Sequence, residues 1–309
     1  MPAATRDAFG HAAMELAEHD SRIYVVDCDI SKSMKTVAFS RKYPSQHINV
    51  GIAEQNGAGI CAGLATLGNI PFLSTYAVFA SMRACEQVRT SICYPRLNVK
   101  LACSHAGLTP SNDGATHQAI EDVAIMRALP NMTVVMGADY NSAKALTKAA
   151  AAYDGPVYLR YTRDVVPDFY DPNEKFEIGK GKLLRSGGSV TIVSFGEMLH
   201  EALKAAEQLE ADGIKVDLID MHTVKPLDTD LLRASIGRTG RCVTVEDHTI
   251  IGGLGSAVGE WMAENDAGRL IRIGLRDCFG QSGPYNVLLE HYQMDCGAIM
   301  DAVKRLLNA

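Results

Sequence analysis

The sequence has 309 residues, of which 47% are hydrophobic and 21% charged, and this is the composition of an ordinary globular protein. The length suggests two domains, because single hydrophobic cores stop growing at about 250 to 300 residues. Thirty basic and thirty-six acidic residues give a formal net charge of -6. A chain with this charge lacks the global positive field that binds nucleic acid, so we expect no nucleic-acid partner.

Cysteine usage and the opening residues bear on the cellular compartment. Eight cysteines are scattered through apolar stretches without a Cys-x-x-Cys pair, so we interpret them as reduced core residues and not as zinc ligands. The start, MPAATRDAFG, lacks the pattern of a secretory signal, and no apolar run approaches the ~18 residues needed to cross a bilayer. We therefore expect a cytoplasmic protein with no membrane partner.

Short apolar, β-branched runs alternate with helix-period segments along almost the whole chain. In the first half they lie at 23–26, 70–74, 99–102, 133–136 and 157–160, and SVTIVSF, VDLIDMH, RCVTVED and RLIRIGL follow in the second half. This alternation is typical of parallel sheets flanked by helices. Prolines, glycines and charges interrupt it over 165–182. We predict two α/β domains, 1–170 and 183–309, joined by a linker at 171–182.

Ligands of open parallel sheets bind beyond the carboxyl ends of the strands, so polar residues just after predicted strands are the first candidates. After a predicted strand at 47–50, the segment Gly-Ile-Ala-Glu-Gln-Asn places Glu54 in the first turn of a helix rich in glycine and alanine. The positive end of the helix dipole can account for a carboxylate there. The small residues that follow also allow a flat ligand to approach, which leaves a functional role open.

A second candidate segment follows the predicted strand at 70–74. It places Tyr76 and Phe79 in the turn after the strand, ahead of a helix that carries Arg83, Glu86 and Arg89. Aromatic side chains in such a place are most often core residues. A flat heteroaromatic cofactor, however, needs a stacking surface of this kind.

A third segment is a turn-rich loop that contains His105, Asp113 and His117. Two imidazoles and a carboxylate resemble metal ligands, but Asp113 can cap the next helix, and imidazoles also donate hydrogen bonds to hydroxyls or phosphate. Asn112 and Asp113, with Asn141 downstream, resemble a magnesium-diphosphate signature. Because Asn112 replaces the glycine that begins that signature, we predict no metal site on this chain.

Two arginines complete the set of candidates. Arg6 opens the first predicted helix, and Arg163 follows the predicted strand at 157–160. Either one alone is expected to be surface charge. Together with Ser33 and His105 they could provide the forked, charge-assisted donors that a sugar phosphate requires.

The second half contains a glycine-rich turn after the predicted strand RCVTVED. Its sequence, Gly252-Gly253-Leu254-Gly255, opens a predicted helix and superficially resembles a dinucleotide-binding loop. The tight strand-to-glycine turn and the downstream acidic residue of that motif are both missing. We therefore predict no dinucleotide site.

With these segments in view, the chain resembles the C-terminal section of a transketolase, which is a pyrimidine-binding domain followed by a C-terminal domain. The resemblance covers essentially the whole chain and rests on ATRDAFG, NVGIAEQN, FLSTYAVFASMRACEQVR, the loop from His105 to His117, and GPVYLRYTRD. It implies the second subunit of a split, heterotetrameric (α2β2) enzyme of carbohydrate metabolism. A separate N-terminal subunit, with Gly-Asp-Gly and a following asparagine, would hold Mg²⁺ and the diphosphate of thiamine diphosphate.

The resemblance also implies residue roles. Glu54 matches the catalytic glutamate that binds a ring nitrogen of the cofactor's aminopyrimidine, Tyr76 matches the residue that stacks on that ring, Phe79 lines the same pocket, and Asp29 lies near the cofactor. The residues that match contacts to the substrate's phosphate are Arg6, Ser33, His105 and Arg163, and those that match contacts to its hydroxyls are Asp113 and His117.

The implied reaction moves a two-carbon ketol unit from a ketose phosphate to an aldose. The segment 108–112 departs from the usual Gly-Glu version of the family, and the segment after Phe79 is one residue longer than in single-chain enzymes. It is therefore open whether a phosphate or another anion, such as a sulfonate, binds Arg6 and Arg163. The small and apolar segment GICAGLATLG is expected at a subunit interface.

Two other functions share parts of this pattern. The β subunit of a 2-oxoacid dehydrogenase's decarboxylating component has both domain types and the glutamate, but the paired arginines and the histidine loop disfavour it. A noncatalytic paralogue is disfavoured because Glu54, Tyr76 and His105 are all present.

Overall fold

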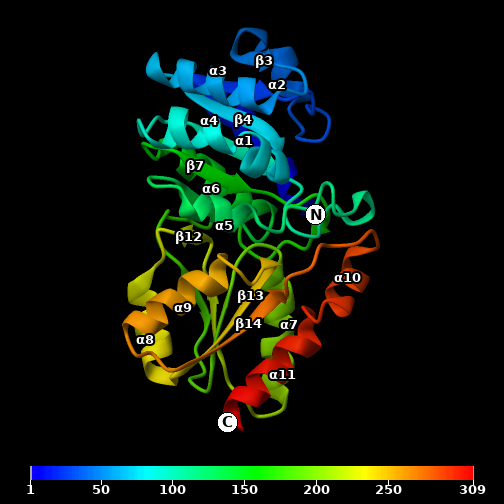
Figure 1. The fold of residues 1–309 in the computed structure, drawn as a ribbon, viewed down its shortest axis with the longest axis vertical. Coiled ribbons are helices and arrows are strands. Elements are labelled where there is room, and N and C mark those ends of the chain that lie inside the picture. Colours follow the sequence, from blue (N-terminus) through cyan, green and yellow to red (C-terminus); the bar gives the residue numbers. More distant parts are fainter. Residues whose placement is uncertain (1, 309) are drawn as a thin grey trace.

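Two mostly parallel sheets, each flanked by helices, lie one above the other in Figure 1. The structure is a computed structural model that describes residues 2–308. The upper sheet is built mainly from the first half of the chain and the lower sheet from the second half. The predicted α/β fold class is therefore confirmed.

The upper sheet has seven strands in the order β12-β6-β7-β5-β4-β2-β3, and every neighbouring pair except β12 with β6 is parallel. The five predicted runs of the first half all form its strands. The elements of this half are β1 (Ala3–Ala4), α1 (Thr5–His19), β2 (Ile23–Asp27), α2 (Val37–Lys42), η1 (Pro44–Gln46), β3 (His47–Asn49), α3 (Glu54–Thr66), β4 (Ile70–Tyr76), η2 (Phe79–Arg83), α4 (Cys85–Gln87), η3 (Val88–Cys93), β5 (Lys100–Ser104), η4 (Ser111–Asp113), α5 (Asp122–Ala128), β6 (Thr133–Met136), α6 (Tyr140–Ala152), β7 (Val157–Arg160) and β8 (Val165–Val166).

The lower sheet has the strand order β14-β13-β10-β11-β9, with β9 antiparallel to its neighbour. The four predicted runs of the second half form β10, β11, β13 and β14. The elements are β9 (Lys182–Arg185), β10 (Thr191–Ser194), α7 (Met198–Ala211), β11 (Asp217–Asp220), β12 (Thr223–Lys225), α8 (Thr229–Thr239), β13 (Arg241–Thr249), α9 (Leu254–Glu264), β14 (Arg269–Leu275), α10 (Tyr285–His291) and α11 (Cys296–Leu307).

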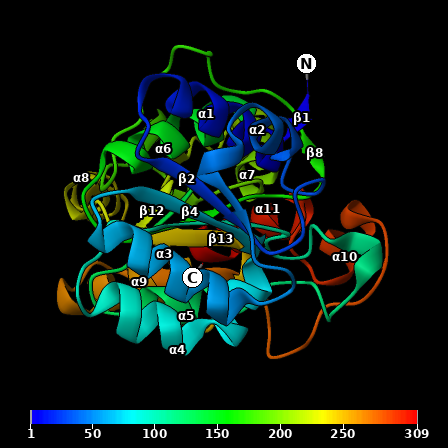
Figure 2. The same ribbon diagram turned by 90° about the horizontal axis from the view of Figure 1, so that it is seen from above.

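Helices cover both faces of the upper sheet. Seen from above in Figure 2, α1 and α6 lie on one side of β2 and β4, and α3, α4 and α5 lie on the other. Strands that are covered on both faces need apolar residues throughout, and this explains the continuous apolar runs in the sequence. None of the helices within the described residues is long and apolar enough to cross a membrane.

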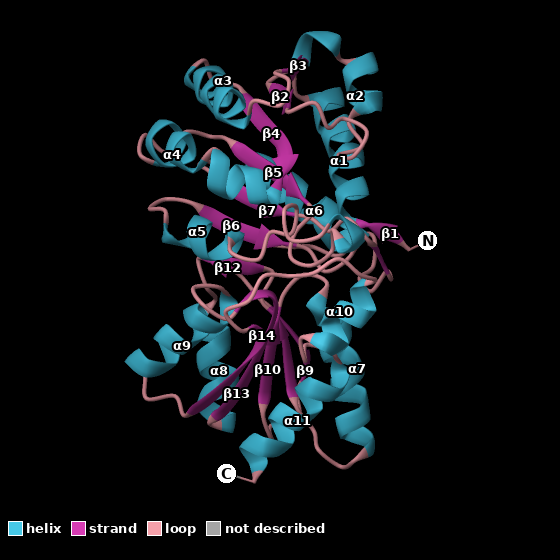
Figure 3. Cartoon of the chain, turned by 45° about the vertical axis from the view of Figure 1, so that its right-hand side comes forward, coloured by secondary structure: helices cyan, strands magenta, loops and turns pink. Residues whose placement is uncertain are grey.

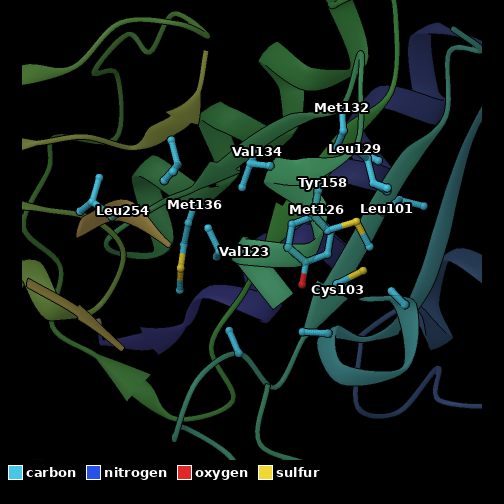
Figure 4. Close-up of a cluster of buried hydrophobic side chains, with 14 of the residues drawn as sticks. Leu101, Cys103, Val123, Met126, Leu129, Met132, Val134, Met136, Tyr158 and Leu254 are labelled. Atoms are coloured by element: carbon cyan, nitrogen blue, oxygen red, sulfur yellow. The ribbon is translucent and has the colours of Figure 1, made fainter. Parts of the chain in front are cut away.

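The two halves interlock more closely than the sequence indicates. β12 belongs to the second half but adds an antiparallel strand to the upper sheet, with Thr223 opposite Val135. In Figure 4, Met136 of β6, Tyr158 of β7 and Leu254 of α9 lie in one buried cluster. The halves therefore share a hydrophobic core, and Figure 3 shows loops of the upper unit gathered against the top of the lower one.

The segment after Tyr76 is less regular than the helix that the sequence predicts. It consists of two π-helical turns, η2 and η3, on either side of the short α4. In these turns the amide of Ala84 bonds to the carbonyl of Phe79 at 3.1 Å, and that of Tyr94 bonds to Arg89 at 3.0 Å. Each bond spans five residues, because a π turn accommodates one extra residue within a helix.

The cysteines are free, as predicted, and Cys28, Cys61, Cys93, Cys103 and Cys242 are buried. The core interpretation is wrong for Cys278, which is exposed. It lies in the loop between β14 and α10, directly after the charged residues Arg276 and Asp277 and before the exposed Phe279.

Candidate active site

The site begins with Glu54, which is the first residue of α3 and only 2% exposed. The helix can bury this residue because Gly57, one turn on, lies directly against β4. A Cβ atom on Gly57 would stand 2.8 Å from Cδ1 of Leu73. The predicted position of Glu54 in a first helical turn is confirmed.

Glu54 has a charged partner that the sequence does not reveal. Arg83, at the end of η2, donates from Nη1 to Oε2 of Glu54 at 2.8 Å. The same guanidinium lies over the ring of Phe79, 4.3 Å from its centroid. The π turn brings Phe79 and Arg83 into this arrangement. The extra residue after Phe79 was the signal in the sequence that could have drawn attention to Arg83.

Aromatic side chains from two loops form a cluster beside this pair. Tyr76, the last residue of β4, lies 3.9 Å from His105 and 5.9 Å from Phe79, measured between ring centroids. His117 lies 5.6 Å from Phe79. The two candidate stacking residues and the two loop histidines are thus brought together from positions up to 41 residues apart in the sequence.

His105 leads the chain out of β5 in a left-handed conformation, with φ of 63°. Its Nδ1 lies 2.8 Å from the hydroxyl of Ser104. Burial and the positive charges of Arg6, Arg163 and His117 lower the pKa of His105 to about 3. The imidazole is therefore neutral near pH 7 and has one N–H to donate.

The two candidate arginines are the charged groups that contribute most to the lowered pKa of His105. The Nε of Arg6 is buried without a hydrogen-bond partner among the described residues, and burial lowers the pKa of this guanidinium. Arg163 donates to the carbonyl of Pro110 at 3.3 Å, and its Nε lies 3.7 Å from Oδ2 of Asp113. A buried guanidinium nitrogen without an acceptor can donate a hydrogen bond to an anionic ligand.

The remaining candidates divide into one that joins the cluster and one that does not. Ser33, in the loop after β2, places its Oγ 2.9 Å from the hydroxyl of Tyr76. Asp29 is exposed and accepts a hydrogen bond from the side chain of Asn49 at 3.1 Å. Within residues 2–308, no hydrogen bond, ion pair or ring contact links Asp29 to the other candidates.

The segment that resembled a magnesium-diphosphate signature has structural partners. Asn141 donates from Nδ2 to the carbonyl of Tyr170 at 2.7 Å, and Asp113 lies in η4 beside Arg163. In the part of the chain that the structure describes, no group of three or more histidine, cysteine, aspartate or glutamate side chains is placed to hold a metal ion.

The glycine-rich turn of the second half is filled from within the protein. The buried carboxylate of Glu246 accepts hydrogen bonds from the amides of Leu254 at 2.7 Å and Gly255 at 2.8 Å, at the start of α9. Burial raises the pKa of Glu246 to about 7. These are the amides that a phosphate would need at a helix N-terminus, so an internal acidic side chain takes the place of a ligand.

Comparison with known proteins identifies the class to which this fold and site belong. Residues 1–168 match the family described as transketolase, pyrimidine binding domain, and residues 179–299 match the transketolase C-terminal domain. The chain belongs to the transketolase family, and it corresponds to the C-terminal section of a split transketolase.

Three relatives show how closely it resembles such sections. A solved structure described as a split gene transketolase, inactive beta4 tetramer, is 47% identical, with a TM-score of 0.91 over 99% of this chain and 98% of the other. The 6-deoxy-6-sulfo-D-fructose transketolase subunit SqwH of Clostridium sp. strain MSTE9 is 42% identical over 96% of this chain and 92% of its own. A subunit of the apulose-4-phosphate transketolase from Phocaeicola vulgatus is 35% identical, over 98% of both chains.

Proposed function

We propose that this chain is the catalytic half of a thiamine-diphosphate-dependent transketolase that works only with a separate diphosphate-binding subunit. The observation that carries the proposal is the buried carboxyl group of Glu54, whose partner Arg83 lies over the ring of Phe79, with Tyr76 next to that ring. A carboxyl group next to a flat apolar surface suits an aminopyrimidine, which needs one acceptor or donor in its plane and a stacking partner on its face. The residues present therefore fit this part of the cofactor.

In this proposal each side chain has a defined task toward the cofactor. Glu54 would hold a ring nitrogen and favour one tautomer of the aminopyrimidine, Tyr76 and Phe79 would pack on the ring, and Asp29 would lie near it. When bound, thiamine diphosphate supplies the nucleophilic carbon and the electron sink that ketol transfer requires. The chain's own contribution is orientation, tautomer control and exclusion of water.

The hydrogen bond from Arg83 affects how Glu54 could bind the cofactor ring. Arg83 donates to Oε2 of Glu54 and so occupies one oxygen of that carboxyl before a ligand arrives. The strength of a bond from Glu54 to the ring would then depend on how much of the Arg83 bond Glu54 retains. We propose Arg83 as a residue that tunes Glu54.

The substrate's anionic end would lie against the cluster of Arg6, Ser33, His105 and Arg163, and its hydroxyls would contact Asp113 and His117. The neutral His105 can donate one hydrogen bond without adding charge, while the two guanidinium groups supply the charge. The names of the relatives include a sulfo sugar and a sugar phosphate. We therefore propose an anionic ketose as donor and an aldose as acceptor.

We also propose that Mg²⁺ and the diphosphate are bound by the separate N-terminal subunit in an α2β2 assembly. The outer face of α3 offers a surface for association, since Cβ atoms on Gly59 and Gly63 would meet nothing within 4 Å and Leu67 is 79% exposed. A stripe of small residues lets another backbone approach closely. A neighbour in structure is itself described as a tetramer.

The test mixes the purified chain with its partner subunit, thiamine diphosphate and Mg²⁺ and measures ketol transfer. Glu54→Gln is expected to lower kcat at least about 100-fold, the usual range for a lost acid-base group. Glu246→Gln is the matched control, because Glu246 is also a buried glutamate at a helix N-terminus but lies outside the site. Unchanged ketol transfer by Glu54→Gln would show that the role given to Glu54 is wrong.

A further inference from the structure

The loop that carries His105, Asp113 and His117 is held in place from the second half of the chain. We call residues 105–117 the substrate loop. The amide of Leu108 donates to both carboxylate oxygens of Asp247, at 3.0 and 2.8 Å. The side chain of Leu108 is fully buried in the hydrophobic cluster of the lower unit, which includes Val245 and Leu288.

Close packing on either side of Leu108 reinforces this contact. Gly107 has φ of 55°, and a Cβ atom there would overlap the carboxylate of Asp247. A Cβ atom on Gly280 would stand 2.6 Å from Cδ2 of Leu108. The side chain of Gln118 donates to the carbonyl of Gln281 at 2.9 Å. The substrate loop is therefore packed closely against the lower unit at Gly107 and Leu108.

Asp247 is itself held by donors from three elements. In addition to Leu108, the hydroxyl of Tyr285 on α10 donates to its Oδ2 at 3.2 Å. The guanidinium of Arg160, at the end of β7, donates to the backbone carbonyl of Asp247 at 2.9 Å. Arg160 is only three residues before Arg163 of the proposed anion site. Asp247 thus contacts the substrate loop through its carboxylate and the end of β7 through its backbone carbonyl.

We propose that Asp247 is a positioning residue for the substrate loop, because its carboxylate fixes the Leu108 amide. Asp247 does not touch the reacting atoms. The inference rests on the proposed function, because the loop matters for catalysis only if it binds the sugar. It assigns to the second half of the chain a direct part in shaping the substrate site.

The first test measures amide hydrogen exchange in the purified full chain, which needs no activity. Asp247→Ala is expected to accelerate exchange in residues 105–118 at least about tenfold, since it leaves the Leu108 amide without its acceptor. Asp217→Ala is the matched control. Asp217 is also a buried carboxylate of the second half and accepts the amides of Gly187 and Gly188, at 2.8 and 3.0 Å. Equal exchange of the substrate loop in both variants would overturn the proposal.

Two further variants keep the test decisive if Asp247→Ala does not fold. In Gly107→Ala the new Cβ atom would push the loop away from the carboxylate of Asp247. This variant is therefore expected to expose the same residues. Its control is Gly240→Ala, where φ is 61° but a Cβ atom would meet nothing within 4 Å, so that it carries the backbone strain alone. Loop exchange in Gly107→Ala no faster than in Gly240→Ala would also overturn the proposal.

In the assembled enzyme, Asp247→Ala should raise KM for the anionic ketose about tenfold or more and lower kcat less, while Asp217→Ala should change neither. A fall in kcat alone would overturn the positioning role. If the wild-type assembly shows no ketol transfer, the proposed function fails, and the exchange data still decide whether Asp247 holds the loop.

Discussion

The hydroxyl of Tyr76 lies 2.9 Å from Oγ of Ser33, and this contact links the proposed cofactor pocket to the proposed anion site. Tyr76 ends β4, and Ser33 lies in the loop that follows the neighbouring strand β2. Because the two strands are parallel and paired, their carboxyl ends open at the same edge of the sheet. A ring proposed to stack on the cofactor thereby orients a hydroxyl proposed to bind the substrate.

A double-mutant cycle measures this link. Tyr76→Phe and Ser33→Ala should each raise KM for the anionic ketose by about two- to tenfold, and the double variant should differ little from either one. The coupling is expected to be about 0.5–1.5 kcal/mol, the net value of a typical intramolecular hydrogen bond. Fully additive effects on KM would contradict a functional link between the two hydroxyls.

The bond between Arg83 and Glu54 gives a second prediction. Arg83→Met leaves a buried carboxylate without its cation, so we expect the free energy of unfolding to fall by about 1–2 kcal/mol, less than for a fully buried pair because Arg83 is 46% exposed. Arg83→Lys keeps the charge and should lose less. Urea unfolding of the chain measures both values, and a Met variant as stable as the wild type would contradict the prediction.

The same variants bear on activity. Without Arg83 the carboxyl group of Glu54 loses the partner that orients it, and we expect kcat of the assembled enzyme to fall by about tenfold for the Met variant. The Lys variant should lie between the Met variant and the wild type. A Met variant with wild-type kcat would show that Arg83 serves folding and not the tuning of Glu54.

The buried ion pair of Arg160 and Asp122 gives a further prediction, on stability. Its two side chains are 1% and 0% exposed, with 2.8 Å between Nε and Oδ2. Arg160→Met leaves the buried carboxylate of Asp122 without its cation, and we expect the free energy of unfolding to fall by about 3–5 kcal/mol. The matched control is Arg233→Met, which breaks an exposed pair with Asp230 and should cost less than about 1 kcal/mol. Similar losses in the two variants would contradict this difference.

His105 predicts a dependence of stability on pH. Its pKa is about 3 in the folded chain and 6.5 for an ordinary histidine, so between these values the unfolded chain binds a proton that the folded chain does not. Stability should therefore fall as the pH drops below about 6.5, by up to about 1.4 kcal/mol per pH unit. His105→Gln lacks this contribution. Chemical denaturation at pH 7 and pH 5 should show the variant gaining up to about 2 kcal/mol relative to the wild type, and a constant difference would refute the prediction.

Much of the fold could be predicted from the sequence because it depends on local patterns. Apolar runs that are buried on both faces identify β4, β5, β6 and β7, and the small residues after Glu54 indicate where α3 begins. Strand β12 could not be predicted in the same way. It is three residues long, and its place in the upper sheet depends on a partner strand about 90 residues earlier in the chain.

The candidate site shows the same division. The sequence by itself determined which side chains follow the strands, and hence Glu54, Tyr76, His105 and Arg163 as candidates, because residue spacing and strand ends are local properties. The tertiary structure alone decided which groups meet. It brings Arg83, at the end of a π turn, to the carboxyl group of Glu54. It also brings the carboxylate of Asp247 to the amide of Leu108, 139 residues away in the sequence. Such contacts depend on how distant strands and loops pack, and periodicity along the chain carries no record of that packing.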